Sequence, residues 1–178
     1  MDPTPRGPSP TRLANGLDGR PVTPDSQAKS IGQEQTFPVD VGEIDELRRV
    51  LLQQTEEVGR RLRRHALAAR TVTVKLRYGD FTTLTRSATL DEATDVTEDL
   101  WREAAGLLGR WAEKHFRPLR LLGVTASQLQ PVGGGQLSLF ENADRARGRA
   151  LDRTLDAIAQ RFGDSAVRRA GQDKPPGR

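Results

Sequence analysis

The sequence has no cysteine among its 178 residues and only two histidines, His65 and His115. Without cysteine there are no disulfide bonds, no thiolate nucleophile and no cysteine-based zinc site. Neither histidine has other ligand residues nearby at the spacing that a metal site requires. We therefore expect the chain by itself to hold no metal and no cofactor.

Long hydrophobic runs are also missing. No apolar segment approaches the roughly 20 residues that a membrane-spanning helix needs. Residues 1–12 contain four prolines and no apolar stretch, unlike a secretory signal. These absences predict a cytoplasmic protein with no membrane partner.

The charge balance is close to even. Lysine and arginine total 28, aspartate and glutamate total 24, and the net charge is +4. A soluble protein rich in arginine has the same balance, so net charge by itself favours a polyanionic partner only slightly.

Composition divides the chain into five segments. Residues 1–12 are rich in proline and serine and predict a disordered leader. Residues 13–29 contain Asn-Gly, Asp-Gly and two X-Pro pairs, as expected of a linker. Periodic patterns over 30–130 indicate one folded domain, a triple glycine marks 131–141 as a flexible tether, and 142–178 form a basic helical tail with frayed last residues.

Residues 71–90 predict a β-hairpin, around which the rest of the chain is organised. Val72, Val74 and Leu76 alternate with polar residues, the period of two expected when one face of a strand is buried. Residues 78–80 have turn chemistry, and a second β-rich run covers 82–89. Shorter strands are predicted over 30–37, with Ile31 and Phe37 inward, and over 119–124.

Two amphipathic helices separate these strands. The first is predicted over 40–65, capped by Asp40 or Gly42, with acidic residues in its first turn. The second begins at a cap on Asp95 or Thr97 and runs to about Lys114. The expected core residues of the two helices are Ile44, Leu47, Leu51, Val58, Leu62, Leu100, Ala104, Leu107, Leu108 and Trp111, with Trp101 at the boundary.

The resulting order is strand–helix–strand–strand–helix–strand. Two helices can cover one face of a four-stranded antiparallel sheet and leave the other face free. The predicted class is α+β, with a ferredoxin-like split βαβ fold, followed by a C-terminal helix whose apolar positions are Leu151, Leu155, Ile158 and Phe162.

The free sheet face is the first candidate site. By alternation its central positions include Lys75 and Arg77, a basic and hydroxyl-rich surface with no acidic residue before Asp91, which suits phosphate oxygens. An ordinary solvated sheet face has the same composition. Arg86 and Arg120 alternate with apolar neighbours and need to reach the rim. The candidate DNA-binding residues are Lys29, Ser30, Thr73, Lys75, Arg77, Thr83, Thr85, Arg86 and Arg120.

Four arginines end the first helix, at positions 60, 61, 63 and 64. They complement the helix dipole as part of a solvated face, or they contact a DNA backbone. The pattern favours the first interpretation.

The second candidate site is the pentapeptide Gln136, Leu137, Ser138, Leu139 and Phe140. Exposed leucine and phenylalanine beyond a glycine tether are unfavourable unless something buries them. Either they add a satellite strand to their own domain, or they enter an apolar pocket of a partner while glutamine supplies orienting hydrogen bonds.

Four segments in this order resemble the little-finger domain of bacterial Y-family translesion DNA polymerases of the polymerase IV type. They read "ANGLDGRPV…AKSIGQEQTF", "KLRYGDFTTLTRS", "RPLRLLGVTASQL" and "QLSLF". The resemblance implies the same split βαβ fold. It also implies that the free face grips primer–template duplex through its major groove, and that "QLSLF" binds the bacterial sliding clamp with Gln136, Leu137, Leu139 and Phe140 as anchors.

The sequence departs from the family in two respects. Such clamp peptides often lie at the extreme C-terminus, whereas residues 141–178 follow this one. The family's catalytic carboxylates precede everything that is matched here, from about Leu13 on. Nucleotidyl transfer needs two metal ions held by such carboxylates. We therefore expect no catalytic residues and no Mg²⁺ unless a palm is joined to the chain.

Three functions remain open at this stage. The preferred one is a non-catalytic module that binds duplex DNA without sequence preference and binds the sliding clamp, in translesion synthesis and DNA repair. The second is a fragment of an active DNA-directed DNA polymerase IV, whose core is on the same or a separate polypeptide. The third is a protein-interaction module that uses only the clamp peptide.

Overall fold

The structure is a computed structural model that describes residues 28–133, 143–163, 166–167 and 169. The predicted leader, nearly all of the predicted linker, the pentapeptide and the last eight residues lie outside these ranges. The elements in chain order are β1 (Ser30–Val41), α2 (Ile44–Arg64), β2 (Leu67–Tyr78), β3 (Thr83–Thr94), α3 (Thr97–His115), β4 (Leu119–Pro131) and α4 (Ala143–Phe162).

The four strands form one antiparallel sheet in the order β1-β4-β2-β3. Helix α2 connects β1 to β2 across β4, and α3 connects β3 to β4 across β2. Each βαβ unit is therefore split by a strand of the other unit, which ties the two halves of the domain together. This arrangement confirms the predicted α+β class and the split βαβ topology.

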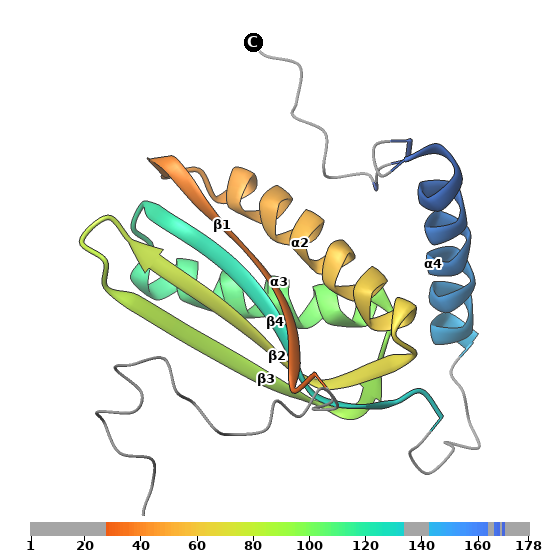
Figure 1. Cartoon of the computed structure of the whole chain (residues 1–178). Helices are drawn as coiled ribbons and strands as arrows, with labels where there is room; N and C mark the ends of the chain where they lie inside the picture. Colours follow the sequence, from red (N-terminus) through yellow and green to blue (C-terminus); the bar gives the residue numbers. More distant parts are fainter. Residues whose placement is uncertain (1–27, 134–142, 164–165, 168, 170–178) are drawn as a thin grey trace, which may run out of the picture.

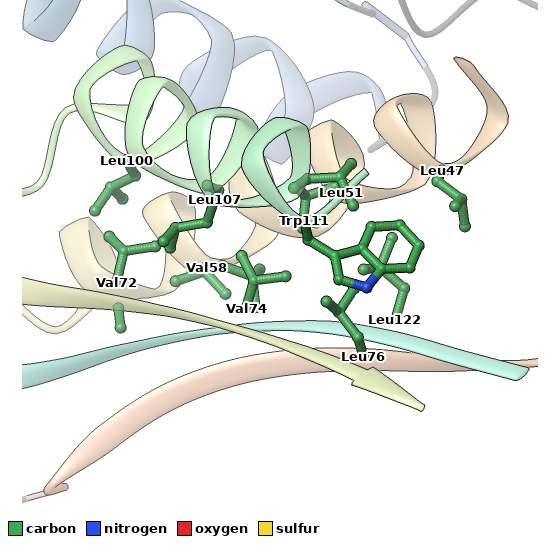
Figure 2. Close-up of a cluster of buried hydrophobic side chains, with 14 of the residues drawn as sticks. Leu47, Leu51, Val58, Val72, Val74, Leu76, Leu100, Leu107, Trp111 and Leu122 are labelled. Atoms are coloured by element: carbon green, nitrogen blue, oxygen red, sulfur yellow. The ribbon is translucent and has the colours of Figure 1, made fainter. Parts of the chain in front are cut away.

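Both α2 and α3 cover the same face of the sheet, while no helix in the described ranges lies over the opposite face (Figure 1). Figure 2 shows side chains from both helices and from β2 and β4 directed toward one another in this layer. Trp111 and Leu107 of α3 meet Val74 and Leu76 of β2 there, and all four are buried. Every predicted core residue of the two helices is buried except Ile44, which is half-buried against the core, and Trp101 lies at the boundary as expected.

The strands extend further than the sequence predicts. Strand β2 begins at Leu67 and β3 continues to Thr94, because the two pair over almost their whole length. Strand β4 continues to Pro131, alongside β1 as far as Ser127 and alongside β2 to its end. Pairing with β2 therefore holds the polar second half of β4 in the sheet, although that half has no apolar alternation.

Both predicted helix caps are wrong. The N-cap of α2 is Glu43 and that of α3 is Val96, and neither makes a capping side-chain hydrogen bond. Asp40 instead pairs with Arg120 of β4. At the start of α3 the backbone N–H of Thr97 donates to Oδ2 of Asp152, at 2.8 Å. A residue of α4, distant in sequence, thus accepts the hydrogen bond of a buried helix N-terminal amide that a local side chain was expected to satisfy.

Helix α4 packs beside the C-terminus of α2 and the N-terminus of α3 (Figure 1). Its attachment is ionic, through pairs that join Arg63 to Asp152 and Asp156, Arg145 to Asp99 and Arg149 to Asp95. Leu151 and Phe162, expected on its apolar side, are 48% and 67% exposed. Of the helices in the described ranges, none is long and apolar enough to cross a membrane.

Candidate nucleic-acid interface

The uncovered sheet face is built from alternate residues of all four strands. In β2 and β3 the register pairs Thr73 with Ser87, Lys75 with Thr85 and Arg77 with Thr83. These positions face away from the buried Val72, Val74 and Leu76. The predicted grouping of Thr73, Lys75, Arg77, Thr83 and Thr85 on one face is therefore confirmed. Most positions on this open face are serine, threonine or glycine, although Leu121 of β4 shares it and is buried.

Hydroxyl groups on this face form cross-strand pairs. The oxygens of Thr73 and Ser87 lie 2.8 Å apart, and Nε of Arg77 donates to Oγ1 of Thr83 at 2.9 Å. Arg77 has no acidic partner within the described part of the chain. Short side chains of this kind let another molecule's backbone approach the sheet closely, and each hydroxyl can still accept or donate a further hydrogen bond.

Lys75 has an acidic partner that alternation did not reveal. Its Nζ lies 2.9 Å from Oε2 of Glu34 on β1, with β4 between the two strands. The intervening residue is Gly123, and a Cβ placed there would come within 2.7 Å of the Glu34 Cβ. Glycine at 123 therefore leaves room for the side chains to meet across β4. The expectation of a face without acidic groups before Asp91 is wrong, because it considered the hairpin and not β1.

Lys29 and Ser30 lie at the start of β1, whose neighbour is β4 and not β2. Ser30 pairs with Ser127, in the row that continues to Thr71 and Thr89, so it does belong to the open face. Lys29 precedes the strand and is exposed. Both lie at the end of the sheet away from Arg77.

Arg86 is not part of the open face, and simple alternation does not place Arg120. Arg86 pairs with Val74, on the side of the sheet that the helices cover, and it is exposed because β3 is an edge strand. Arg120 lies where the β2–β4 register shifts, and it pairs with Asp40. Asp40 in turn lies against Gly79, where any Cβ would clash with its carboxylate.

Two of the arginines at the end of α2 bind other elements of the fold, Arg61 to β1 and Arg63 to α4. The interpretation as a solvated face is therefore wrong for these two. Arg63 forms two hydrogen bonds with Asp156, at 2.6 and 2.9 Å, and Arg61 donates to the Gly32 carbonyl at 2.8 Å. Burial by itself would lower the pKa of Arg63. The hydrogen bond with Asp156 and the charges of Asp152, Asp156 and Asp95 outweigh burial, so the pKa lies above its ordinary value.

The turn between β2 and β3 is held by Asp80. Its Oδ1 accepts the backbone N–H of Thr82 at 2.9 Å, and its Oδ2 lies 3.0 Å from Arg117. The hydrogen bond from Thr82, followed by that from Arg117, lowers the pKa of Asp80. Within the described ranges no group of three or more His, Asp or Glu side chains is placed to hold a metal ion.

The pentapeptide at 136–140 lies outside the described residues. The elements on either side of it are described, since β4 ends at Pro131 and α4 begins at Ala143. Both interpretations of the pentapeptide therefore remain predictions.

Residues 28–139 match the impB/mucB/samB family C-terminal domain. DNA polymerase IV of Desulfatibacillum aliphaticivorans is 40% identical over 157 residues, which cover 87% of this chain and 39% of that protein. DNA polymerase IV 2 of Halalkalibacterium halodurans is 38% identical over 162 residues, covering 88% and 39%. The chain thus spans about two fifths of the length of these curated relatives.

A solved structure of a Y-family DNA polymerase chimera has a similar fold. Its TM-score is 0.54 at 18% sequence identity, over 68% of this chain and 34% of that one. At this identity the match concerns the fold alone.

Proposed function

The chain belongs to the impB/mucB/samB family of C-terminal domains, and from that premise we propose that its open sheet face binds the backbone of duplex DNA without reading the base sequence. The domain is a little finger of the Y-family type, as the sequence resemblance predicts. The observation that carries the proposal is the open face itself. It presents Lys75, Arg77 and rows of hydroxyls, with Glu34 as the acidic group among them.

The relatives' activity fits such a surface. DNA polymerases hold primer–template duplex of any sequence, and contacts to phosphates position a protein without specifying bases. A sheet surface of short side chains can approach the duplex, and its cations replace condensed counterions. Such a module works where chromosomal DNA is, in the cytoplasm, and its place is in translesion synthesis and DNA repair.

In this proposal, nucleotidyl transfer is carried out by a catalytic palm and not by the little finger. The relatives are enzymes, and the chain spans about two fifths of their length. Nucleotidyl transfer needs metal ions held by converging carboxylates, and we assign these, with Mg²⁺, to a polymerase core on the same or a separate polypeptide. The chain by itself binds DNA and does not extend a primer. If it is part of an active polymerase IV, the same contacts supply processivity.

Charge reversal tests the DNA-binding face. In a fluorescence anisotropy titration of labelled duplex, Lys75→Glu with Arg77→Glu should weaken binding by about tenfold or more and lower the salt slope of log K by about two, one for each phosphate contact. The control is Arg48→Glu with Arg110→Glu, which changes the net charge by the same amount at exposed positions of α2 and α3. Affinity that is independent of salt, or equal losses in both variants, contradicts the proposal.

We propose a second function for the pentapeptide, which is binding to the bacterial sliding clamp. The motif Gln136 to Phe140 lies between β4 and α4, so a bound clamp would be tethered to the DNA-binding domain. Two weak contacts in one chain raise each other's effective concentration.

The two functions can be separated in one experiment. Leu137→Ala with Phe140→Ala should abolish binding to purified clamp in surface plasmon resonance and leave duplex affinity unchanged. Ser138→Ala, at the position that is not an anchor, should bind the clamp normally. Loss of clamp binding with no DNA binding in any variant would favour the interaction module over the DNA-binding module.

A further inference from the structure

A cavity of about 390 Å³ opens beside the β2–β3 hairpin, on the side of the sheet that the helices cover. Its walls combine aromatic rings, Tyr78 and Phe116, with three cations, Arg86, Lys114 and Arg117, and with Leu84. It is separate from the open face, because Arg86 and Leu84 lie on the opposite side of β3 from Thr83 and Thr85.

The aromatic wall is fixed in place from behind. Trp111 donates from Nε1 to the hydroxyl oxygen of Tyr78 at 2.9 Å, and its ring packs against Phe116 with centroids 5.6 Å apart. The guanidinium of Arg117 stacks on the Tyr78 ring, 4.4 Å from its centroid. The cavity thus presents a planar cation backed by an aromatic ring, and beside it the Phe116 ring, which is 41% exposed. Both planes are formed before any ligand arrives.

The cations are available to an anion. Arg86 donates to the carbonyl of Thr85 in its own strand, at 2.9 Å, and has no acidic partner among the described residues. Lys114 is exposed and likewise has no ion-pair partner there. Arg117 pairs with Asp80 at 3.0 Å, but both side chains are about half exposed, and such pairs contribute little and exchange readily.

Phe81 is a third aromatic residue at this end of the sheet, in the hairpin turn directly after Asp80, whose carboxylate pairs with Arg117 of the cavity wall. It is 73% exposed and has a φ of 65°, a left-handed conformation that bulky residues rarely adopt. The turn is closed by hydrogen bonds between Tyr78 and both Phe81 and Thr82. An exposed phenyl ring in a disfavoured backbone conformation is unexplained by packing, since it gains no burial.

We propose that this hairpin-end site binds an unpaired segment of a DNA strand, with bases stacked on the Arg117 plane, Phe116 and Phe81, and phosphates on Arg86 and Lys114. Stacking surfaces beside cations are the chemistry with which proteins hold single strands without sequence preference. An acidic peptide would use the cations but would gain nothing from three planar surfaces.

Continuity with the open face favours the same ligand. Arg77 and Tyr78 are consecutive in β2 and point to opposite faces, so Arg77 ends the open face where the hairpin-end site begins. A strand that leaves a duplex on the open face reaches the site by passing the exposed Phe81. This path of the strand rests on the proposed binding of duplex to the open face, whereas the hairpin-end site itself does not depend on it.

The test compares a blunt duplex with the same duplex carrying a short thymidine overhang. A 5′ and a 3′ overhang are tested separately. One of the two should raise the affinity of the full chain for the duplex by about tenfold, the effect expected of one stacked base. Arg86→Glu with Lys114→Glu, and separately Phe81→Ser, should remove that gain and leave blunt-duplex affinity unchanged. Arg48→Glu with Arg110→Glu is the control with the same change of charge.

Failure of this inference is distinguishable from failure of the proposed function. No gain from either overhang, or a gain that survives in both variants, overturns the hairpin-end site while blunt-duplex binding still stands. If blunt duplex does not bind, oligothymidine alone tests the site, and equal binding to wild type and Phe81→Ser overturns it. Polyglutamate that displaces oligothymidine from the wild type and binds Phe81→Ser undiminished assigns the site to acidic peptides and also overturns it.

Discussion

Lys75 pairs with Glu34 in the free protein, and in the proposed complex with DNA a phosphate competes for it. The ion pair is partly exposed, with side-chain exposures of 32% for Lys75 and 54% for Glu34. Pairs of this kind stabilise a fold by at most about 1 kcal/mol. In the proposed complex with DNA, Glu34 would therefore act mainly on the affinity for duplex, since it reduces the positive potential at the middle of the open face.

Replacing Glu34 should strengthen duplex binding. Glu34→Gln keeps the shape of the side chain, releases Lys75 and removes one repulsive charge, so duplex affinity should rise by about threefold or more at low salt. The measurement is the same anisotropy titration. Glu46→Gln, an exposed position of α2, is the matched control and should change nothing. Unchanged or weaker binding by Glu34→Gln would mean that phosphates do not meet Lys75.

Single residues were predicted well where a local pattern determines them. Alternation along one strand is sufficient to place Thr73, Lys75 and Arg77 on one face. It says nothing of Glu34, because that contact depends on β4 lying between β1 and β2 and on Gly123 having no side chain. It also does not determine the position of Arg120, since a shift of register beside that residue interrupts the alternation.

At the scale of an element, α4 is held by charge more than by apolar burial. Asp152 is 1% exposed and receives hydrogen bonds from Thr97 and Arg63, while Leu151 and Phe162 remain largely in solvent. The pKa of Arg63 is higher in the folded protein than in the unfolded chain. The stability that this arginine contributes is therefore complete at any pH below its ordinary pKa, and it is lost only as the pH rises through the raised pKa. Alkaline conditions that keep the protein folded should therefore leave this arginine's contribution intact.

Removing Arg63 should loosen α4. Arg63→Ala leaves Asp156 without its main cation and leaves Asp152 paired with Arg169. Breaking a largely buried pair costs about 3 kcal/mol of unfolding free energy. Urea denaturation measures the loss, and faster amide exchange in α4 than in α3 locates it. Arg147→Ala removes an arginine of α4 whose side chain is 83% exposed, and it should stay within about 0.5 kcal/mol of wild type. Equal effects of the two substitutions would contradict the ionic attachment.

The elements themselves were predicted from periodicity, and their ends were not. The stripe of Leu47, Leu51, Val58 and Leu62 is sufficient to identify α2. The start of α3 has its amide satisfied by Asp152, a residue 55 positions away. No local cap signal contains that information, so Asp95 and Thr97 looked like caps although neither serves as one.

At the scale of the whole molecule, the split βαβ topology divides the domain into a covered face and an open face. Composition and element order predicted this division, because two amphipathic helices can bury only one side of the sheet. The strand order β1-β4-β2-β3 was not predicted, since it depends on which strands pair over long sequence separations. Because of that order β3 is an edge strand, and its residues Leu84 and Arg86 line the cavity at the hairpin end.

The location of bound duplex on the molecule tests the central claim most directly. The measurement is the perturbation of backbone amide signals in ¹⁵N-labelled protein as a short blunt duplex is added at low salt. We predict that the largest changes spare the exposed sides of α2 and α3 and fall on the open-face residues Thr73, Lys75, Arg77, Thr83 and Thr85. Changes confined to the helices, or no changes under conditions where duplex binds the relatives, would contradict it.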